Sequence, residues 1–595
     1  MKLWKFTNYA IAISFNTKTI ILNPMHGWTG KTVTIDLTDS EIKESKSNPD
    51  NLRSFIGGRG LGVKLYSDAI EPNIDPLSPE NILIFATGPL TGTLAPMSGR
   101  HAMVSKSPLT GTIFDSSSGG FFGKELKFAG IDALVIKGKA KKPVYIAVKN
   151  DEIEIHSANE LWGENVRACT DKLSSQGRVA CIGRAGERLV PMANVMNDYF
   201  HACGRGGLGA VMGGKNLKAV VVKGDMKPAI ADEEGFKKAR HEALHLLKAG
   251  QAVSKGLSTY GTSAAVNLMN YMKILPANNF RISGFSGADK ISGEFIKEHY
   301  DIKSNTCYNC TVACKHVIKS GALEGHEVPE YETLWAYGPD SNNADIDEII
   351  KVNRLCNDYG IDTISSGSTI AAYAEIMGED VKELSQLVKK IGEKEGIGVE
   401  LGKGSKAFAA SRKKDVAMHV KGLELPGYDP RGVLGMALAY ASSNRGGCHL
   451  RAYMIAPEIL GKPIKVEPKT FSGKAGLVQV FQNATAALDS LVLCIFSSFT
   501  LHEVEYANML SAATGVYYTA EEFRKCGERI WNLERLFNIK AGFTRKDDCL
   551  PERFFGSGGL NRAEFERALD EYYHFRGWDG NGVPTREKLS ELELL

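Results

Sequence analysis

Short apolar runs separated by glycine turns fill the chain from about residue 27 to residue 224. Six of these runs are rich in β-branched side chains and have the length and composition of strands. They are KTVTIDLT, NILIFATG, ALVIKGK, PVYIAVK, RVACIG and KAVVVKG. We therefore expect an α+β domain built on β-sheets at residues 25–230. The segment NVMNDYFHAC, just before Gly204, lacks this pattern and is not predicted to form a strand.

From Asp232 onward, apolar residues recur at positions i, i+3 and i+4, which is the period of an amphipathic α-helix. The pattern is clearest in the segments 233–250, 345–360, 381–396 and 520–540. The segment 424–432 contains glycine and proline and is predicted to be a loop. We predict that two mostly α-helical domains, 231–425 and 426–595, follow the β-rich domain.

The composition is that of a large globular protein. A chain of 595 residues is too long for one core, and its 43% apolar and 24% charged residues are ordinary values. A formal net charge of +3 without a long basic run argues against a nucleic-acid binder, and no apolar stretch is long enough to span a membrane. An apolar patch within residues 1–24 is broken by Asn16 and Lys18, so we interpret this segment as an extension upstream of Met25 and not as a signal peptide.

Two glycine-rich segments resemble each other. GGRGLGVKLY (57–66) and GRGGLGAVMG (204–213) both place Arg and Leu among glycines before an apolar run. We interpret them as an internal duplication whose two copies hold two similar ligands, with chance similarity of glycine turns as the alternative. The second segment also spells G-x-G-x-x-G, but without a strand before it we discount a dinucleotide site.

Cysteine spacing supplies the strongest chemical signal. The chain has 11 cysteines, an odd number scattered over a long sequence, which argues against a disulfide framework and favours a reducing, cytoplasmic location. Cys307, Cys310 and Cys314 form C-x2-C-x3-C. With a distant fourth cysteine this spacing suits a [4Fe–4S] cluster. Zinc completed by His316 is the alternative, which we disfavour because His316 is so close in sequence to Cys314.

Spacing alone does not choose the fourth cysteine. The candidates are Cys356, Cys448, Cys494, Cys526 and Cys549. Cys494 lies in the apolar run LDSLVLCIFSS, which also carries Asp489. Because a buried carboxylate needs a partner, we expect this segment to face a site.

These features together resemble the tungsten- or molybdenum-dependent aldehyde ferredoxin oxidoreductase family over nearly the whole chain from Met25. The motifs GWTGKTVTIDLT, FIGGRGLGVKLY, FATGPLTGT, SGRHAMVSKSPLTGT and GRGGLGAVMGGKNLKA carry the resemblance in the first half. PEYETLWAYGP, NDYGIDTISSG, NRGGCHLRAY and ALDSLVLC carry it in the second half. The resemblance implies one tungsten or molybdenum held by two pterins, without a protein ligand. It also implies a nearby [4Fe–4S] cluster on the three clustered cysteines and Cys494.

The resemblance further implies which residues hold the pterins. The family motif D-x-x-G-x-D becomes Asn357 to Asp362, with Asn in place of the first Asp and Gly360 retained, whereas D-x-x-x-x-C is intact from Asp489 to Cys494. An amide still offers an acceptor oxygen and adds two donors, so pterin binding is expected to survive the change.

The pterin phosphates are expected to meet glycine-turn amides and cations. The resemblance selects Arg59, Arg100 and Arg205 as partners, together with the backbone at Gly204, Gly206 and Gly207. It also implies a Mg²⁺ ion that joins the two phosphates through the carbonyls of Ser117 and Ala202. Ser117 stands where the family commonly has Asn.

The implied reaction is oxidation of an aldehyde to the carboxylic acid with water, with electrons passing through the cluster to ferredoxin. Glu332 would act as a base and His449 would donate a hydrogen bond to the carbonyl oxygen, with Glu330 as the alternative base. A homodimer is common in the family. The alternatives are a bis-pterin oxidoreductase of the same fold acting on a carboxylic or 2-hydroxy acid, and an electron-relay subunit that holds only the cluster.

Overall fold

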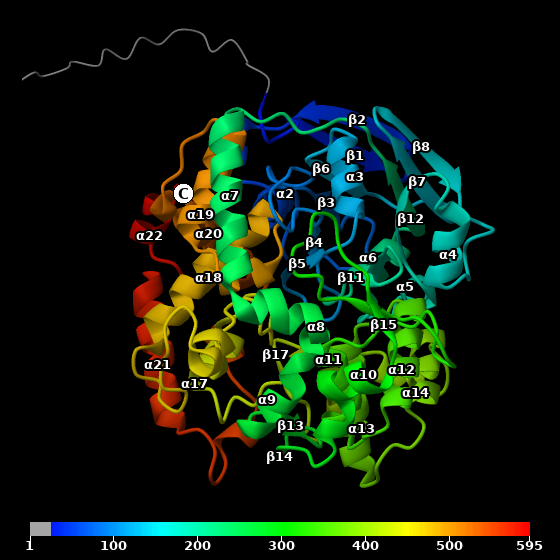
Figure 1. Cartoon of the computed structure of the whole chain (residues 1–595), viewed down its shortest axis with the longest axis vertical. Helices are drawn as coiled ribbons and strands as arrows, with labels where there is room; N and C mark the ends of the chain where they lie inside the picture. The colour runs from blue at the N-terminus through cyan, green and yellow to red at the C-terminus, as the bar shows by residue number, and fades with distance from the viewer. Residues whose placement is uncertain (1–24) are drawn as a thin grey trace, which may run out of the picture.

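The structure is a computed structural model that describes residues 25–595, so the extension predicted at residues 1–24 lies outside the described residues. Two mixed six-stranded sheets form the N-terminal region (Figure 1). The first contains β1 (Lys31–Asp36), β2 (Glu41–Lys46), β3 (Leu83–Ala86), β4 (His101–Lys106), β5 (Ile113–Ser118) and β6 (Ala133–Lys137). The second contains β7 (Val144–Lys149), β8 (Glu152–Ser157), β9 (Arg178–Cys181), β10 (Val195–Asn197), β11 (His201–Cys203) and β12 (Leu217–Lys223).

The two sheets have the same topology. The first has the order β2-β1-β6-β3-β4-β5, and the second, counted from its other edge, is β8-β7-β12-β9-β10-β11. In each sheet the one parallel pair joins the first and last strands in sequence, β1 with β6 and β7 with β12. Each strand of one sheet therefore has a counterpart six strands later in the other.

All six strand predictions are confirmed, as β1, β3, β6, β7, β9 and β12. The expectation that NVMNDYFHAC forms no strand is wrong, because the segment contains β10 and β11. Each of these strands has only three residues, too few to show a period-2 pattern. A dinucleotide site needs a strand–helix–strand unit with neighbouring parallel strands, whereas β11 is an edge strand that pairs only with β10, antiparallel, so the two strands do not restore that interpretation.

Six short helices connect the strands: α1 (Pro49–Phe55), α2 (Gly58–Ala69), α3 (Phe122–Phe128), α4 (Val166–Leu173), α5 (Arg184–Glu187) and α6 (Leu208–Gly214). Helix α2 lies between β2 and β3, whereas α6 lies between β11 and β12. These connections are not counterparts in the repeated topology. The two glycine-rich segments that begin these helices are therefore not equivalent copies, which corrects the pairing suggested by the sequence.

The rest of the chain is largely helical. Its first part contains α7 (Glu233–Ala249), α8 (Ser258–Tyr260), α9 (Ala265–Tyr271), α10 (Gly293–His299), α11 (Tyr331–Tyr337), α12 (Ile346–Tyr359), α13 (Thr363–Met377), α14 (Leu384–Glu393), α15 (Gly398–Leu401) and α16 (Ser405–Ser411). Its second part contains α17 (Leu434–Ser442), α18 (Lys474–Leu491), α19 (Glu503–Thr514), α20 (Ala520–Lys540), α21 (Arg562–Arg576) and α22 (Arg586–Glu591). The four helices predicted from periodicity are confirmed as α7, α12, α14 and α20. Three small two-stranded sheets interrupt the helices. They pair β13 (Pro276–Ala277) with β14 (Ile282–Ser283), β15 (Ile302–Ser304) with β16 (His316–Ile318) and β17 (His419–Val420) with β18 (Leu423–Glu424).

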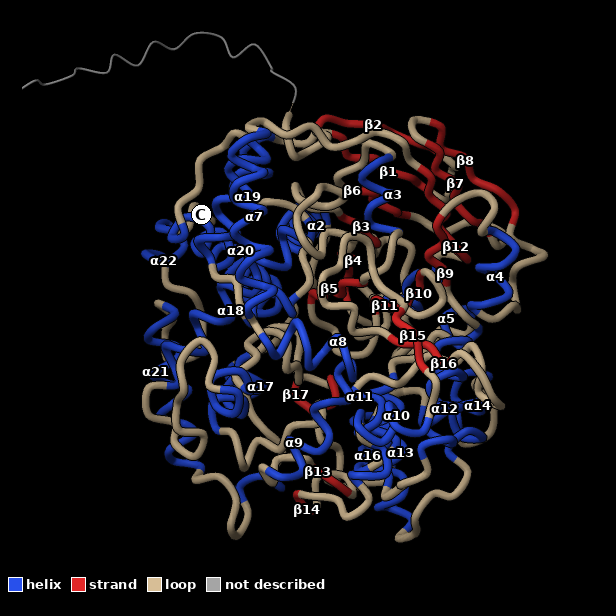
Figure 2. Tube along the Cα trace, viewed as in Figure 1, coloured by secondary structure: helices blue, strands red, loops and turns tan. Residues whose placement is uncertain are grey.

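Figure 2 shows the strands of the two large sheets gathered in one part of the molecule and the helices around the remainder. The C-terminal helices return to the N-terminal region, where α18 and α20 both pack on α2. Within residues 25–595 no helix is long and apolar enough to cross a membrane.

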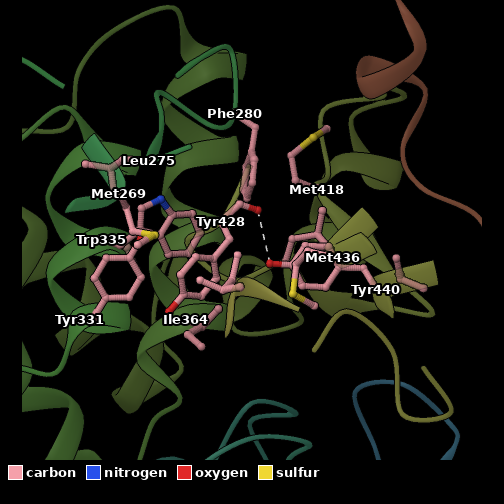
Figure 3. Close-up of a cluster of buried hydrophobic side chains, with 14 of the residues drawn as sticks. Met269, Leu275, Phe280, Tyr331, Trp335, Ile364, Met418, Tyr428, Met436 and Tyr440 are labelled. Atoms are coloured by element: carbon pink, nitrogen blue, oxygen red, sulfur yellow. Dashed lines mark hydrogen bonds between the residues drawn. The ribbon is translucent and has the colours of Figure 1, made fainter. Parts of the chain in front are cut away.

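The helical region has an aromatic-rich core (Figure 3). Tyr331 and Trp335 of α11 contribute to it together with Tyr428 from the loop before α17, and the Tyr331 and Tyr428 rings are 5.1 Å apart. The same hydrophobic cluster contains side chains from both sides of residue 425. The domain boundary near that residue stays a prediction.

Candidate active site

The three clustered cysteines and Cys494 lie together. Cys310, Cys314 and Cys494 border one hydrophobic cluster, and all four thiols are half-buried, whereas six of the other seven cysteines are fully buried. Burial raises the pKa of each of the four thiols, and each also has another of the four close enough to raise it further. Four cysteines gathered at one position offer the soft sulfur donors that an iron–sulfur or other soft metal centre takes.

The end of α18 brings Cys494 to this position. Val492 ends the helix with φ 61°, an uncommon conformation for a β-branched residue. The glycine turn before α2 packs directly against this helix end. A Cβ added to Gly58 would lie 2.3 Å from a Val492 methyl, and the Gly60 N–H donates to Ser490 Oγ at 3.0 Å. Glycine is required here for close packing of the two regions.

Arg100 lies between the thiols and the first sheet. Its Nη2 donates to the Ser117 carbonyl at 2.9 Å and to Ser117 Oγ at 3.1 Å. A Cβ added to Gly119 would lie 2.8 Å from Cys307 Sγ and 3.4 Å from Arg100 Nη1. The guanidinium is therefore beside the cysteine set.

The other two predicted arginines are buried and paired with the predicted aspartates. Arg59 Nη1 donates to Asp489 at 3.2 Å, and its other nitrogens bind Glu534 at 2.7 and 2.8 Å. Arg205 Nε donates to Asp362 at 3.0 Å. Each arginine therefore neutralises an acid that the helical region brings to the N-terminal region.

Ser117 and Ala202 occupy counterpart positions in the two sheets. The ladder Ala133–Ala86–Ala102–Ser117 in the first sheet corresponds to Ala219–Cys181–Met196–Ala202 in the second. Both residues are half-buried on edge strands, and these two strands, β5 and β11, contact each other (Figure 1). The sheets therefore meet where both predicted carbonyl ligands lie.

The second glycine segment has two distinct roles. Gly206 and Gly207 have φ 86° and 75°, and a Cβ on either would collide with Phe114 or with the Pro191 carbonyl. Gly204 is half-buried and has only the Ala202 methyl, at 3.8 Å, near an added Cβ. Only Gly204 therefore borders open space.

The segment from Asn357 to Asp362 joins two helices. Gly360 ends α12 with φ 71°, and the Asp362 carboxylate accepts from the Ile364 N–H at 3.0 Å to cap α13. Asn357 Nδ2 donates to Glu327 at 2.8 Å, and Asp358 pairs with Arg354 at 2.8 Å. The latter is ordinary helix-surface pairing.

Glu332 and His449 face each other. The distance from His449 Nε2 to Glu332 Oε1 is 3.6 Å, and Glu332 Oε2 accepts from the Gly427 N–H at 2.9 Å. Glu332 Oε1 and His449 Nδ1 are buried without a hydrogen-bond partner. Burial raises the pKa of Glu332 to about 8, and burial, with Arg205 and Arg445 nearby, lowers the pKa of His449 to about 3. At pH 7 the carboxyl group is mostly protonated and the imidazole is neutral.

Glu330 has a different environment. Lys315 Nζ lies 3.0 Å from its carboxylate, and the Thr262 hydroxyl donates to it. Burial raises its pKa, but the charge of Lys315 and the hydrogen bonds from Thr262 and Lys315 together outweigh burial, and the net effect is a lowered pKa. Glu330 is therefore an ionised, paired group, unlike Glu332.

Two arginines of the motif NRGGCHLRAY were missed in the sequence. Arg451 pairs with Asp489 at 2.8 Å and with Asp115 at 3.0 Å, and Arg445 Nη2 donates to Cys448 Sγ at 2.9 Å. The Nε atoms of both arginines are buried without a partner. Both arginines lie in the same motif as His449, and this proximity in sequence could have identified them as site residues.

No group of three or more His, Cys, Asp or Glu side chains in the described part of the chain is arranged around a single metal ion. His316, the ligand of the zinc alternative, has its Nε2 3.1 Å from the Ser258 carbonyl.

Comparison with known proteins defines the class of the protein. The family model "Aldehyde ferredoxin oxidoreductase, N-terminal domain" matches residues 32–224, and the model for domains 2 and 3 of the same family matches residues 238–594. The two-sheet region followed by a helical region is thus the architecture of an oxidoreductase. The chain belongs to the aldehyde ferredoxin oxidoreductase family, as the sequence resemblance indicated.

Several relatives cover nearly the whole chain, and two of them represent the range of identity. A tungsten-containing aldehyde ferredoxin oxidoreductase of Pyrococcus furiosus is 41% identical over 96% of this chain and 99% of its own length. The WOR-like subunit of an aliphatic sulfonate oxidoreductase from the same organism is 30% identical over 96% and 97%. Among solved structures, the benzoyl coenzyme A reductase BamBC complex has a chain with TM-score 0.84, 24% identity and coverage of 96% and 97%, which shows the fold alone.

Proposed function

We propose that this protein oxidises an aldehyde to the carboxylic acid with water and passes the electrons to ferredoxin. The observation that supports this most directly is the Glu332–His449 pair, which has an unpartnered oxygen and an unpartnered nitrogen in a buried site. Buried polar atoms rarely remain unpaired unless a ligand uses them.

The donor set fits a bis-pterin centre. Arg100, Arg445 and Arg451 gather near Asp489 and Asp115, and two of these arginines keep a free buried Nε–H. Guanidinium groups suit phosphate and the polar edges of pterins. Asp362, Asp489, Asn357 and the backbone at Gly360 would hold the rings, with Arg59 and Arg205 fixing the two aspartates.

The phosphates would lie where the sheets meet. Ser117 and Ala202 occupy counterpart positions in the two sheets. This supports a magnesium ion that joins two pterin phosphates, with one carbonyl ligand from each sheet. Gly204 would contribute backbone close to the phosphate. The Ser117 carbonyl already accepts from Arg100, and its second lone pair remains for the ion.

When bound, the tungsten or molybdenum centre would accept the electron pair and a [4Fe–4S] cluster on Cys307, Cys310, Cys314 and Cys494 would relay single electrons. The chain itself handles protons and orientation. The neutral His449 would donate one N–H to the aldehyde oxygen, which polarises the carbonyl. Glu332, in its ionised form, would remove the proton from water or from the aldehyde hydrate. The buried tyrosines Tyr331, Tyr428 and Tyr440 exclude bulk water from this pair.

Purified holoenzyme tests the proposal. We expect about four irons and one tungsten or molybdenum per chain, together with viologen reduction that depends on an aldehyde. Iron without a heavy metal would favour the electron-relay alternative. Both metals without activity on short, aromatic or phosphorylated aldehydes would favour another substrate, an outcome that the 30% identical sulfonate oxidoreductase relative makes worth testing.

A further inference from the structure

The cysteine loop reaches the surface on one side. Thr311 is exposed, and Cys310 beside it is half-buried. Asn309 ties this loop to the segment 94–97, because its Nδ2 donates to the Ala95 carbonyl at 2.7 Å and its carbonyl accepts from the Met97 N–H at 2.8 Å. Whatever contacts segment 94–97 therefore lies close to the thiols.

That segment carries an exposed leucine. Leu94 has 60% of its surface exposed, and its carbonyl accepts a hydrogen bond from Arg240 Nε at 2.7 Å. Arg240 belongs to α7. An exposed apolar side chain next to a cation is a typical composition for a protein–protein contact.

Helix α7 packs close to the cysteine site. Its buried face packs into the same hydrophobic cluster that borders Cys310, Cys314 and Cys494; the helix residues in it are Phe236, Ala239, Ala243 and Leu247. Arg240, Leu244 and Lys248 are spaced four residues apart, so they form one row along the helix beside Leu94. We call Leu94 and this row the α7 row.

The charge of the α7 row is positive. Glu233 lies on the same face two turns before Arg240, Glu234 pairs with Lys237 at 2.6 Å, and Glu242 lies on the other side of the helix, so the stretch from Arg240 to Lys248 carries only positive charge on this face. Lys248 is exposed and makes no ion pair with any side chain in the described part of the protein. At the same end, the π-helix Ala252–Leu257 contacts the turn Ile495–Phe499 that follows Cys494.

We propose that the α7 row is the docking surface for an acidic protein that carries one electron at a time. This inference rests on the proposed function and adds the place where electrons leave. Oxidation of one aldehyde releases two electrons, so two oxidised carrier molecules each take up one electron at this surface and leave reduced. Opposite charges across the contact raise the association rate and weaken with salt.

The test compares two electron acceptors, a purified acidic ferredoxin and benzyl viologen, with a saturating aldehyde. In Lys248→Glu and in Leu94→Asp we expect the KM for ferredoxin at low ionic strength to rise about tenfold, with an unchanged viologen rate. The matched control is Lys389→Glu on α14, an exposed lysine on a helix that lies away from α7 in Figure 1. It carries the same charge change and should leave both acceptors unaffected.

Several results would overturn the docking surface. One is an unchanged ferredoxin KM in both α7-row variants, another is the same increase in Lys389→Glu, and a third is an equal fall in the ferredoxin and viologen rates. If no aldehyde reduces viologen, the proposed function fails, and the docking surface is then tested by calorimetry. Oxidised ferredoxin should bind the wild type about tenfold more tightly than Lys248→Glu at low salt, and equal affinities would refute the inference.

Discussion

The pKa of Glu332 gives a quantitative test of the catalytic assignment. An ordinary glutamate with a pKa of 4.5 is fully ionised at pH 7, but a pKa of about 8 leaves only about one-tenth of Glu332 ionised. If the carboxylate is the base, kcat/KM should rise about tenfold per pH unit between pH 6 and pH 7.5 and level off above pH 8. Glu332→Gln should lower kcat/KM by about 10²- to 10⁴-fold and abolish this rise of kcat/KM with pH.

The assay is aldehyde-dependent viologen reduction from pH 6 to pH 9.5. Glu330→Gln is the matched control, because it makes the same change two residues away on a carboxylate that Lys315 keeps ionised. This control should retain the rise of kcat/KM between pH 6 and pH 8. A kcat/KM of the wild type that does not change with pH, or the same rise in Glu332→Gln, would refute the reasoning.

The same group affects stability with a defined sign. Folded Glu332 binds its proton more tightly than the unfolded chain does, so its contribution to stability is complete below pH 4.5 and is lost as the pH rises to about 8. The full effect has an upper limit of about 5 kcal/mol. Glu332→Gln should therefore raise the melting temperature relative to wild type at pH 9 and do so much less at pH 5. Equal differences at the two pH values would show that burial does not perturb this carboxyl group.

Three further substitutions test other parts of the site. Cys494→Ser should lower iron content and visible absorbance, whereas Cys526→Ser, a buried cysteine outside the set, should keep both; iron loss in neither variant would contradict the ligand assignment. Arg205→Met leaves the buried carboxylate of Asp362 unpaired and should destabilise the protein by about 3–5 kcal/mol in denaturant unfolding, and a loss below about 1 kcal/mol would show that the pair is unimportant. His449→Asn should lower kcat by about 10²- to 10³-fold. The shape of the pH profile above pH 5 should stay the same, because His449 is already neutral there. An unchanged kcat would remove His449 from the mechanism.

The strands that could be predicted are inner strands of the two sheets. β1, β3 and β6, like β7, β9 and β12, each have a neighbouring strand on both sides, and their apolar side chains contribute to the sheet cores. The missed strands include the four edge strands β2, β5, β8 and β11 and also two inner strands, β4 and β10. β2 reads EIKESK with almost every side chain exposed, and β5 reads IFDSSS. Edge strands owe their conformation to pairing with a neighbour, so their own composition carries little signal.

The site was predictable only where chemistry follows local spacing. C-x2-C-x3-C identified three thiols directly, but the choice of Cys494 needed the family resemblance. Arg451 was missed because its partner Asp115 is 336 residues away in the sequence, and no periodicity relates two such positions. The orphaned Nε–H of Arg451 likewise becomes visible only once the ion pairs of its other nitrogens are known.

The two glycine-rich segments show why sequence similarity can point to the wrong repeat. Each places an arginine where the backbone of the N-terminal region meets an aspartate of the helical region, Arg59 with Asp489 and Arg205 with Asp362. That shared electrostatic requirement arises at two different connections of the fold, after β2 and after β11. What repeats in the topology is the ladder that ends at Ser117 in one sheet and at Ala202 in the other, and these two residues share no side-chain chemistry. Every residue has a backbone carbonyl, so a role of the carbonyl places no requirement on the side chain of that residue. A structural repeat can therefore be present where the two sequences are not similar.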